Sequence, residues 1–436
     1  MSQKKKSTKK KGSAGAGTWR TRLSTARRSV SSKLSGNDDS GNRILTVTIR
    51  ILAVVAAVAL IVGLWRGRVD CSLGNLAQCA RDIPSMTGKG DGFPITVTGG
   101  TTLQLDEMSG GIAALTDSTF SIFNHSSKQA VSRAHHMSNP GMKTAGRYAL
   151  VFDIGKRLVR LETASDTLSE LSCGGTIVSG AVSHNGRFAV ALSAPEGGTS
   201  ALSQVVVYDK SGQWIYRYNT STHYINDIAL SPDGKYIAMS GITAKDGIMQ
   251  SMLMVHKVIE NSDGMTEDEL RKKAVTGTFE QTDNTFLSLE FTNTNTLFAI
   301  GTAKVLIVDD FGKSSRVVDL VGSLMAFDVD YDCGAAVYTT EILDGNIGNL
   351  QLFDTRGQLR FSKEVPLYGV SVSLDTTGCC VLGRGEMHCY RLSGEQLGAW
   401  DTGVTASSVQ MIDRRAYVCD GITIKPTELI TTDSEK

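Results

Sequence analysis

A strand–turn–strand unit recurs along most of this chain. Its clearest copy is INDIALSPDGKYIAMSG at 225–241, in which two short apolar strands flank an SPDG turn. Period-two alternation is typical of half-buried antiparallel strands, and Gly, Asn and Asp are typical of tight hairpin turns. We count eight such units, which span residues 103–117, 142–153, 177–193, 225–241, 286–302, 325–340, 369–385 and 409–421.

A second hairpin follows most of these units. Examples are VVVYDKSGQWIYRY, LQLFDTRGQLRFSK and MHCYRLSGEQLGAW. The turns recur roughly every 42 residues, which is the period of a four-stranded propeller blade. The pattern therefore predicts an all-β fold, a β-propeller of eight blades, with seven as the alternative if the divergent unit at 140–173 is misread. Short strands at so regular a period favour radial repetition over a single sandwich.

The last unit, 406–429, offers three strands and lacks a fourth. An unassigned strand, FPITVTG at 93–99, precedes the first unit. We expect this strand to become the outer strand of the last blade, because joining the two ends of the chain removes the exposed sheet edges of an open array.

The only long apolar run is Ile44–Trp65, ILTVTIRILAVVAAVALIVGLW. As a helix, 22 residues span about 33 Å, the thickness of a bilayer core, so we predict one transmembrane helix. Arg50 lies near one end, where it can snorkel, and Trp65 suits the interface. A cleaved signal peptide is the alternative, but no small-x-small site follows the run.

Charge is distributed unevenly on the two sides of that run. Residues 1–43 hold twelve Lys and Arg against two Asp, whereas residues 70–436 hold thirty basic and forty-two acidic residues. Basic flanks stay in the cytoplasm, so we predict a disordered cytoplasmic tail at 1–43 and an extracellular propeller. The acidic excess argues against a nucleic-acid partner for the propeller. The remaining segments are a connector at 66–92, the propeller at 93–429 and a C-terminal tail at 430–436.

Four of the eight cysteines are candidates for disulfides. Cys71 and Cys79 could close a small loop in the connector. Cys380 and Cys389 lie directly opposite each other if CCVLG and EMHCY form a hairpin, at a Cα separation within disulfide range. Two free, buried thiols remain the alternative for that pair.

Other polar clusters are interpreted as structural. His135 and His136 are adjacent, so in a strand they point to opposite faces and make a poor metal site. The acidic segments 328–332 and 309–310 lack the Ca²⁺-loop spacing. We therefore expect no metal, cofactor or catalytic residue. An insertion at 261–275, with a capping box of Thr266 and Glu269, predicts a short helix, either a blade-edge loop or a partner-binding protrusion.

The chain resembles uncharacterised, membrane-anchored, propeller-like proteins of Gram-positive bacteria, within the WD-repeat and TolB-like superfamily. The residues that carry this resemblance are Gly90-Asp91-Gly92-Phe93-Pro94, Ser138-Asn139-Pro140 and the SPDGK turn. The resemblance implies a single-pass topology and a propeller outside the cytoplasmic membrane. It implies no activity and no site residues.

The sequence thus favours a binding or scaffold module for a protein or cell-envelope component, held in the bilayer by Ile44–Trp65. The alternative is an extracytoplasmic propeller enzyme acting on glycans or peptides. In a third interpretation, the basic tail recruits a cytoplasmic partner and the propeller acts as a sensor.

Overall fold

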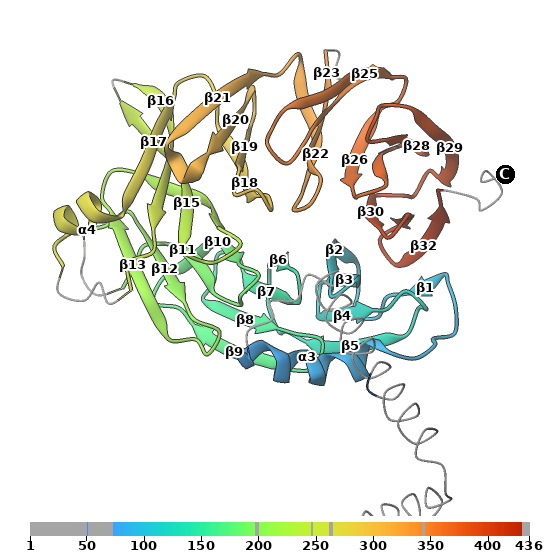
Figure 1. The fold of residues 1–436 in the computed structure, drawn as a ribbon, viewed down its shortest axis with the longest axis horizontal. Coiled ribbons are helices and arrows are strands. Elements are labelled where there is room, and N and C mark those ends of the chain that lie inside the picture. Colours follow the sequence, from blue (N-terminus) through green and yellow to red (C-terminus); the bar gives the residue numbers. More distant parts are fainter. Residues whose placement is uncertain are drawn as a thin grey trace, which may run out of the picture. The chain divides into compact units, whose positions relative to one another are not determined.

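The computed structural model describes residue 50 and residues 73–429, except for 197–199, 246, 261–264 and 342–344. Within the described part, eight four-stranded antiparallel sheets are arranged in a ring (Figure 1). The prediction of an eight-bladed propeller is confirmed. The seven-blade alternative is wrong, because the divergent unit forms a complete sheet of its own, β6 to β9.

Strands run from the central channel outwards in chain order in the first seven blades. Blade 1 contains β2 (Thr102–Met108), β3 (Gly111–Thr116), β4 (Thr119–Phe123) and β5 (Gln129–Ala134). Blade 2 contains β6 (Pro140–Ala145), β7 (Tyr148–Asp153), β8 (Leu158–Glu162) and β9 (Thr167–Ser172). Blade 3 contains β10 (Thr176–Val182), β11 (Phe188–Ser193), β12 (Ser203–Tyr208) and β13 (Trp214–Thr220). Blade 4 contains β14 (Tyr224–Leu230), β15 (Tyr236–Lys245), β16 (Ile248–Lys257) and β17 (Val275–Gln281).

The second half of the ring repeats this order. Blade 5 contains β18 (Phe286–Phe291), β19 (Leu297–Gly301), β20 (Lys304–Asp309) and β21 (Ser314–Asp319), with the short helix η1 (Asp310–Gly312) before β21. Blade 6 contains β22 (Ser323–Asp330), β23 (Gly334–Thr340), β24 (Gly348–Phe353) and β25 (Leu359–Val365). Blade 7 contains β26 (Gly369–Leu374), β27 (Gly378–Gly383), β28 (Gly385–Arg391) and β29 (Gln396–Gly403). Blade 8 contains β30 (Ser408–Ile412), β31 (Arg415–Cys419), β32 (Thr423–Glu428) and β1 (Ile95–Thr96).

The ring closes in blade 8 through the segment FPITVTG. Its strand β1 is the outer strand of that blade, with Ile95 opposite Ile424 and Thr96 opposite Thr423. The Val97 N–H extends the pairing by donating to the Ile422 carbonyl at 2.8 Å. The predicted closure is therefore confirmed, and the N- and C-terminal ends of the propeller share one sheet.

Strand direction defines the two faces of the disc. We call the four strands of a blade a to d from the channel outwards. Because neighbouring strands are antiparallel, the a–b and c–d turns lie on one face, which we call the bottom face. The b–c turns and the d–a connections between blades lie on the opposite face, which we call the top face.

The SPDG turn shows why the repeat needs its polar residues. The Gly234 N–H donates to the Ser231 carbonyl at 2.8 Å, and the Asp233 carboxylate accepts from the Ser231 hydroxyl at 2.7 Å. Gly234 has a φ of +65°, which glycine adopts at little cost. Local side-chain bonds thus fix the a–b turn that begins the second strand.

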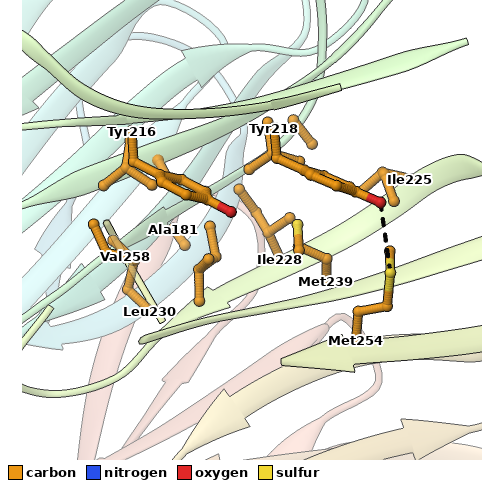
Figure 2. Close-up of a cluster of buried hydrophobic side chains, with 14 of the residues drawn as sticks. Ala181, Tyr216, Tyr218, Ile225, Ile228, Leu230, Met239, Met254 and Val258 are labelled. Carbon is orange, nitrogen blue, oxygen red and sulfur yellow. Dashed lines mark hydrogen bonds between the residues drawn. The ribbon is translucent and has the colours of Figure 1, made fainter. Parts of the chain in front are cut away.

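The hydrophobic core is divided among the blade interfaces. The described residues form eight buried clusters, and each lies mainly between two neighbouring blades. Figure 2 shows the cluster between blades 3 and 4, where Tyr216 and Tyr218 from β13 lie over Ile228, Leu230 and Met239. The Tyr218 hydroxyl reaches the Met254 sulfur at 3.8 Å. Each blade is therefore stabilised by both of its neighbours.

A helix that the sequence analysis did not predict, α3 (Leu73–Met86), lies in the connector and packs on the bottom face. Its Asp82 forms an ion pair with Arg147 in the a–b turn of blade 2, and accepts from the Ser165 hydroxyl in the c–d turn at 2.6 Å. Asn124 in blade 1 donates to the carbonyls of Met86 and Gly88 at 2.9 Å. The second half of the connector is thus docked on blades 1 and 2.

The insertion in blade 4 forms the helix α4 (Glu267–Ala274). Its capping box is as predicted, because the Thr266 N–H donates to the Glu269 carboxylate at 3.0 Å and the Glu269 N–H donates to the Thr266 hydroxyl at 3.3 Å. Leu270 and Ala274 are buried in the cluster between blades 3 and 4. The helix is therefore a packed edge of blade 4 and not a free protrusion.

None of the helices in the described part of the chain is both long and apolar enough to cross a membrane. The predicted transmembrane segment Ile44–Trp65 lies outside the described residues, apart from Arg50. The predicted tails at 1–43 and 430–436 also lie outside them.

Candidate functional site

The inner strands enclose a cavity of about 430 Å³ in the central channel. Its lining mixes carboxylates with apolar residues and extends to the a–b turns, so the cavity reaches the bottom face. The charged and aromatic groups of the lining are Asp106, Glu107, Lys143, His184, Glu290, Phe291, Phe327, Asp328, Asp330 and Tyr331.

Two contacts cross the channel between blades that are not neighbours. Lys143 of blade 2 forms an ion pair with Glu290 of blade 5 at 2.5 Å. At the bottom face, the rings of His184 and Tyr331 lie 4.1 Å apart, centroid to centroid, and join the turns of blades 3 and 6. Both contacts narrow the passage through the disc.

Carboxylates also connect neighbouring inner strands. Asp227 of blade 4 accepts from the Ser179 hydroxyl of blade 3 at 2.6 Å and from the Leu289 N–H of blade 5 at 2.8 Å. Asp328 of blade 6 accepts from the Leu374 N–H of blade 7 at 2.8 Å. These bonds satisfy inner-strand amides that have no ladder partner towards the channel. Their primary role is to hold the ring together.

The channel changes the proton affinity of its charged groups. Burial raises the pKa of Asp106 to about 6. Hydrogen bonds from Thr144 and the Glu107 amide lower this pKa, but burial has the larger effect. Burial raises the pKa of Asp328 to about 7, and the nearby carboxylates of Asp330 and Asp106 add to that rise. For Lys143 burial opposes the charge, yet Glu290, Asp227 and Asp106 together raise the pKa. These pKa shifts favour a charged Lys143 and, near pH 7, a protonated fraction of Asp328.

A pH series on Asp328→Asn tests this arrangement. A carboxyl group with a raised pKa binds its proton more tightly in the folded state, so its contribution to stability falls as pH rises from about 4 to 7. Asparagine does not ionise, so it removes this loss of stability at higher pH. Its side-chain oxygen can still accept the hydrogen bond from the Leu374 N–H. Because Asp328 is only partly buried, so that solvent screens its charge, we expect the variant to gain on the order of 1–2 kcal/mol relative to wild type between pH 5 and 8. Denaturant midpoints at several pH values measure the difference, and parallel curves for the two proteins would contradict it.

The top face has a different character, because it carries most of the exposed apolar side chains. Of fourteen large apolar residues exposed in the described part of the chain, eleven lie on b–c turns, d–a connections or the adjoining strand ends. These are Leu103, Ile154, Tyr224, Ile248, Met249, Leu287, Val321, Ile347, Val370, Val404 and Ile422. The other three lie on α3 or on outer strands. This one-sided distribution makes the top face the candidate interaction surface of the propeller.

A repeated β-bulge places part of this apolar surface at the channel mouth. In six of the eight inner strands, one extra residue interrupts the ladder near the top end. The extra residues are Leu103, Val178, Asn226, Leu287, Met325 and Val370, five of them apolar. Bulges redirect side chains, so the repetition builds a mostly apolar rim around the top of the channel.

The predicted cysteine pair of blade 7 lies in the expected register. Cys380 on β27 is opposite Cys389 on β28, and Leu382 is opposite Met387. The two sulfurs lie 2.02 Å apart in a disulfide, with both residues fully buried. Cys71 lies outside the described residues, and so does the side chain of Cys79, which belongs to α3.

The Cys380–Cys389 disulfide can be tested by the reactivity of its two thiols. In the oxidised protein, we expect neither thiol to react with an alkylating reagent under denaturing, non-reducing conditions, and both to react after reduction. Peptide mapping by mass spectrometry checks this, with the buried free thiol of Cys419 as the internal control. Alkylation of Cys380 without reductant would contradict the bond.

The other polar residues singled out in the sequence have structural surroundings. The His135 ring is buried and bonds to the Thr116 carbonyl at 3.0 Å, whereas His136 is exposed. Asp309 accepts from the Thr296 hydroxyl at 3.1 Å, and Asp310 pairs with Lys313 at 2.7 Å. No group of three His, Cys, Asp or Glu suited to a metal occurs among residues the structure describes.

The glycine-rich stretch before β1 also has a packing role. A Cβ on Gly90 would lie 2.4 Å from the backbone of the Ser127–Lys128 turn, so only glycine fits. The Gly90 N–H donates to the Ser126 carbonyl at 2.9 Å. Likewise, the amides of Ser138 and Asn139 donate to the Asp153 carboxylate. The glycine-rich stretch thus attaches the connector to blade 1, and the segment Ser138-Asn139-Pro140 fixes the start of blade 2.

Sequence reasoning missed the channel residues Lys143, Asp227 and Glu290 and the apolar rim. A signal for Asp227 and for the apolar rim was present in the aligned repeats, whereas Lys143 and Glu290 follow no repeated position. Each bulged inner strand carries an extra residue at one fixed place, and a polar residue follows it in five copies, Gln104, Ser179, Asp227, Ser288 and Ser371. A polar residue recurring inside an otherwise apolar strand indicates a shared hydrogen-bonding position.

Solved structures resemble this chain in fold. Sqt1 from Chaetomium thermophilum is 12% identical, with a TM-score of 0.50 over 76% of this chain and 96% of that one. AztD from Citrobacter koseri is 14% identical, with a TM-score of 0.48 over 71% and 88%. BamB from Moraxella catarrhalis is 13% identical, with a TM-score of 0.45 over 77% and 100%. At such identities only the propeller fold is shared.

A comparison with curated proteins gives no match. Residues 94–421, well over half of the chain, match Family of unknown function (DUF5711). The matched range begins at Pro94, next to the closing strand β1, and ends just before β32, so it covers nearly the whole propeller. The chain belongs to this family.

Proposed function

We propose that this chain is a membrane-anchored binding module that presents the top face of its propeller to a protein or cell-envelope partner. The concentration of exposed apolar side chains on that face is the observation that carries the proposal. Desolvating such side chains drives most protein association, at roughly 25 cal/mol per Å². The acidic excess of residues 70–436 disfavours nucleic acid as that partner.

The position of α3 limits how far the bottom face of the propeller can lie from the proposed anchor. Residues 66–72 separate the predicted span Ile44–Trp65 from the first residue of α3. Seven residues reach at most about 25 Å. Because α3 is docked on the bottom face, an anchor at 44–65 would hold that face near the bilayer and direct the top face away from it. In our proposal the tail at 1–43 is cytoplasmic and the propeller is outside the cell.

A topology experiment tests the anchored part of this proposal. Protease added to intact cells should digest the propeller once its fold is loosened by mild heating, and should spare an epitope placed at residue 2. Digestion of both regions, or of neither, would contradict the single-span arrangement.

The binding role is tested by changing the top face alone. In the variant Leu103→Ser, Leu287→Ser, Val370→Ser, three exposed bulge residues become polar. We expect crosslinked partners recovered from intact cells to fall at least tenfold, while the melting temperature stays within about 2 °C of wild type. The control is Val317→Ser, Leu359→Ser, which removes equally exposed apolar groups from outer strands. Equal recovery from both variants would overturn the proposal.

One observation favours a second candidate, an extracytoplasmic hydrolase for glycans or peptides. Asp106 and Asp328 face a shared cavity with raised pKa values, and paired carboxyl groups can supply acid and base. We rank this candidate lower because Asp328 is engaged by a backbone amide. Hydrolysis of a model glycan or peptide by the wild type, abolished in Asp106→Asn, would establish it.

A further inference from the structure

The b–c hairpin of blade 4 is longer than any other in the described part of the propeller. Its strands β15 and β16 share ten residue pairs, from Tyr236↔Lys257 to Lys245↔Ile248. The corresponding ladders of the other blades have at most six pairs. The extra length continues past the top of the sheet as a two-stranded ribbon, residues 243–245 paired with 248–250, in the yellow-green part of Figure 1.

Both outer edges of this ribbon are unpaired within the described part of the chain. The β14 ladder reaches only Ile242, which pairs with Tyr224, and the β17 ladder reaches only Ser251, which pairs with Gln281. Beyond these pairs, no strand that the structure describes lies beside the backbone amides and carbonyls of the edges. Native proteins usually protect such edges with proline, with charges or by shortening the strand.

The β16 strand of this ribbon, residues 248–250, has instead kept apolar side chains and carries no charge. Ile248 is 58% exposed and Met249 is 59% exposed. The register places Met249 opposite Ala244, on the sheet face that packs Ala238 and Leu253 towards blade 5 deeper in the blade. Ile248 lies on the other face. A strand added to the edge of β16 would therefore find an apolar contact on each side of the sheet.

Acidic groups lie beside the same edge. Glu280 and Asp283 are exposed at the top end of β17 and in the connection that follows it. A strand added to β16 at residues 248–250 would continue the line of β17 beyond Gln281. Its end nearest to β17 would meet these two carboxylates, which favours Lys or Arg at that end.

We propose that the ribbon captures an extended segment of the partner polypeptide as an added β-strand on the edge of β16. This inference rests on the proposed binding role of the top face and specifies the partner's chemistry. The captured segment has apolar side chains at alternate positions and a basic residue at the end next to Glu280 and Asp283. Main-chain hydrogen bonds supply affinity and the alternating side chains supply specificity.

Random dodecapeptides displayed on phage, selected against the purified full-length chain, provide the probe. A selected peptide is synthesised and its Kd is measured by fluorescence anisotropy. We expect the Kd to rise at least tenfold for a trimmed variant in which Asn-Gly replaces residues 243–250. That replacement keeps the pair Ile242↔Ser251 and closes it with a two-residue hairpin turn. The Glu280→Gln, Asp283→Asn variant should weaken binding and reduce its salt dependence.

Backbone methylation separates strand addition from ordinary apolar contact, and it does not depend on any variant folding. In an added strand, the N–H groups of alternate residues donate hydrogen bonds to the edge of β16, and the N–H groups between them point away from it. N-methylation of one alternate set in the peptide should therefore abolish binding, and methylation of the other set should preserve it.

Several results would overturn the inference. These are the absence of any selected peptide, equal affinity for the trimmed variant, and equal effects of the two methylated sets. A wild-type dimer in sedimentation that the trimmed variant loses would also do so, because the occupant of the edge would then be a second copy. If the trimmed variant binds normally while the Leu103, Leu287, Val370 variant still loses its cellular partners, the ribbon inference fails and the proposed function stands.

Discussion

Aspartate at positions 95 and 97 should open the propeller ring and remove much of its stability. Ile95 and Val97 are buried in the cluster between blades 8 and 1, together with Ile424 and Tyr417. The variant Ile95→Asp, Val97→Asp loses two apolar contacts and must either bury two carboxylates or release the strand. We expect a cost on the order of 5 kcal/mol. Whole domains of this kind are stable by only about 5–15 kcal/mol.

The same strand supplies a matched control. Thr96 and Thr98 alternate with the buried pair and are exposed. The variant Thr96→Asp, Thr98→Asp adds the same charge to the same segment on its solvent side and should change stability by less than about 1 kcal/mol. Thermal unfolding compares the two variants, and limited proteolysis locates the opening at the junction of blades 8 and 1. Equal melting temperatures would mean that the ring does not depend on β1.

Closure was predictable because it follows from strand counting. The last repeat unit has three strands, and one unassigned strand precedes the first unit. Pairing that strand with the last unit is the one arrangement that leaves no blade with a missing strand. Blade number, the hairpin register of Cys380 and Cys389, and the cap at Thr266 were predictable for a different reason. Each depends on residues close in the sequence, whose spacing determines which atoms meet.

The features that escaped prediction depend on residues far apart in the chain. Lys143 and Glu290 meet only because blades 2 and 5 face the same channel, and 147 positions separate them. Helix α3 has Gly74 and Asn75 in its first turn and Pro84 within it, so its sequence gives a weak helical signal. Its stability comes from docking on Arg147 and Asn124, which lie in two different blades. Distant contacts of this kind carry no local pattern.

The docking of α3 matters for the proposed function, because it decides which face of the disc the N-terminal segment leaves from. Asp82 is central to that docking. It is 6% exposed, it forms the ion pair with Arg147, and it accepts the Ser165 hydroxyl. Arg147 is equally buried at 6%. If the helix were released, the connector would lengthen from seven to more than twenty residues, and the bottom face would no longer be held close to the proposed anchor.

Asp82→Ala should therefore detach α3 from the propeller while the blades stay folded. Removing one partner of a buried ion pair leaves the other charge uncompensated, at a cost of about 3–5 kcal/mol. Detachment lets water reach Arg147, so the measured loss is limited to the free energy that holds the helix in place. We expect faster amide exchange across residues 73–86 and proteolytic cleavage within 66–92, with nearly unchanged exchange in blades 3 to 8.

Two further variants make this result specific to the buried pair. Arg81→Ala lies on the same helix, but its ion pair with Asp166 is 3.9 Å long and largely exposed, so its effect should stay below about 0.5 kcal/mol. Asp82→Ala combined with Arg147→Met removes both charges and keeps apolar volume near Tyr148. This double variant should recover protection of α3 relative to Asp82→Ala alone, because no buried charge is left without its partner. Equal exchange in the single and double variants would show that Asp82 holds the helix through Ser165 instead, and that the ion pair contributes little to the orientation of the disc.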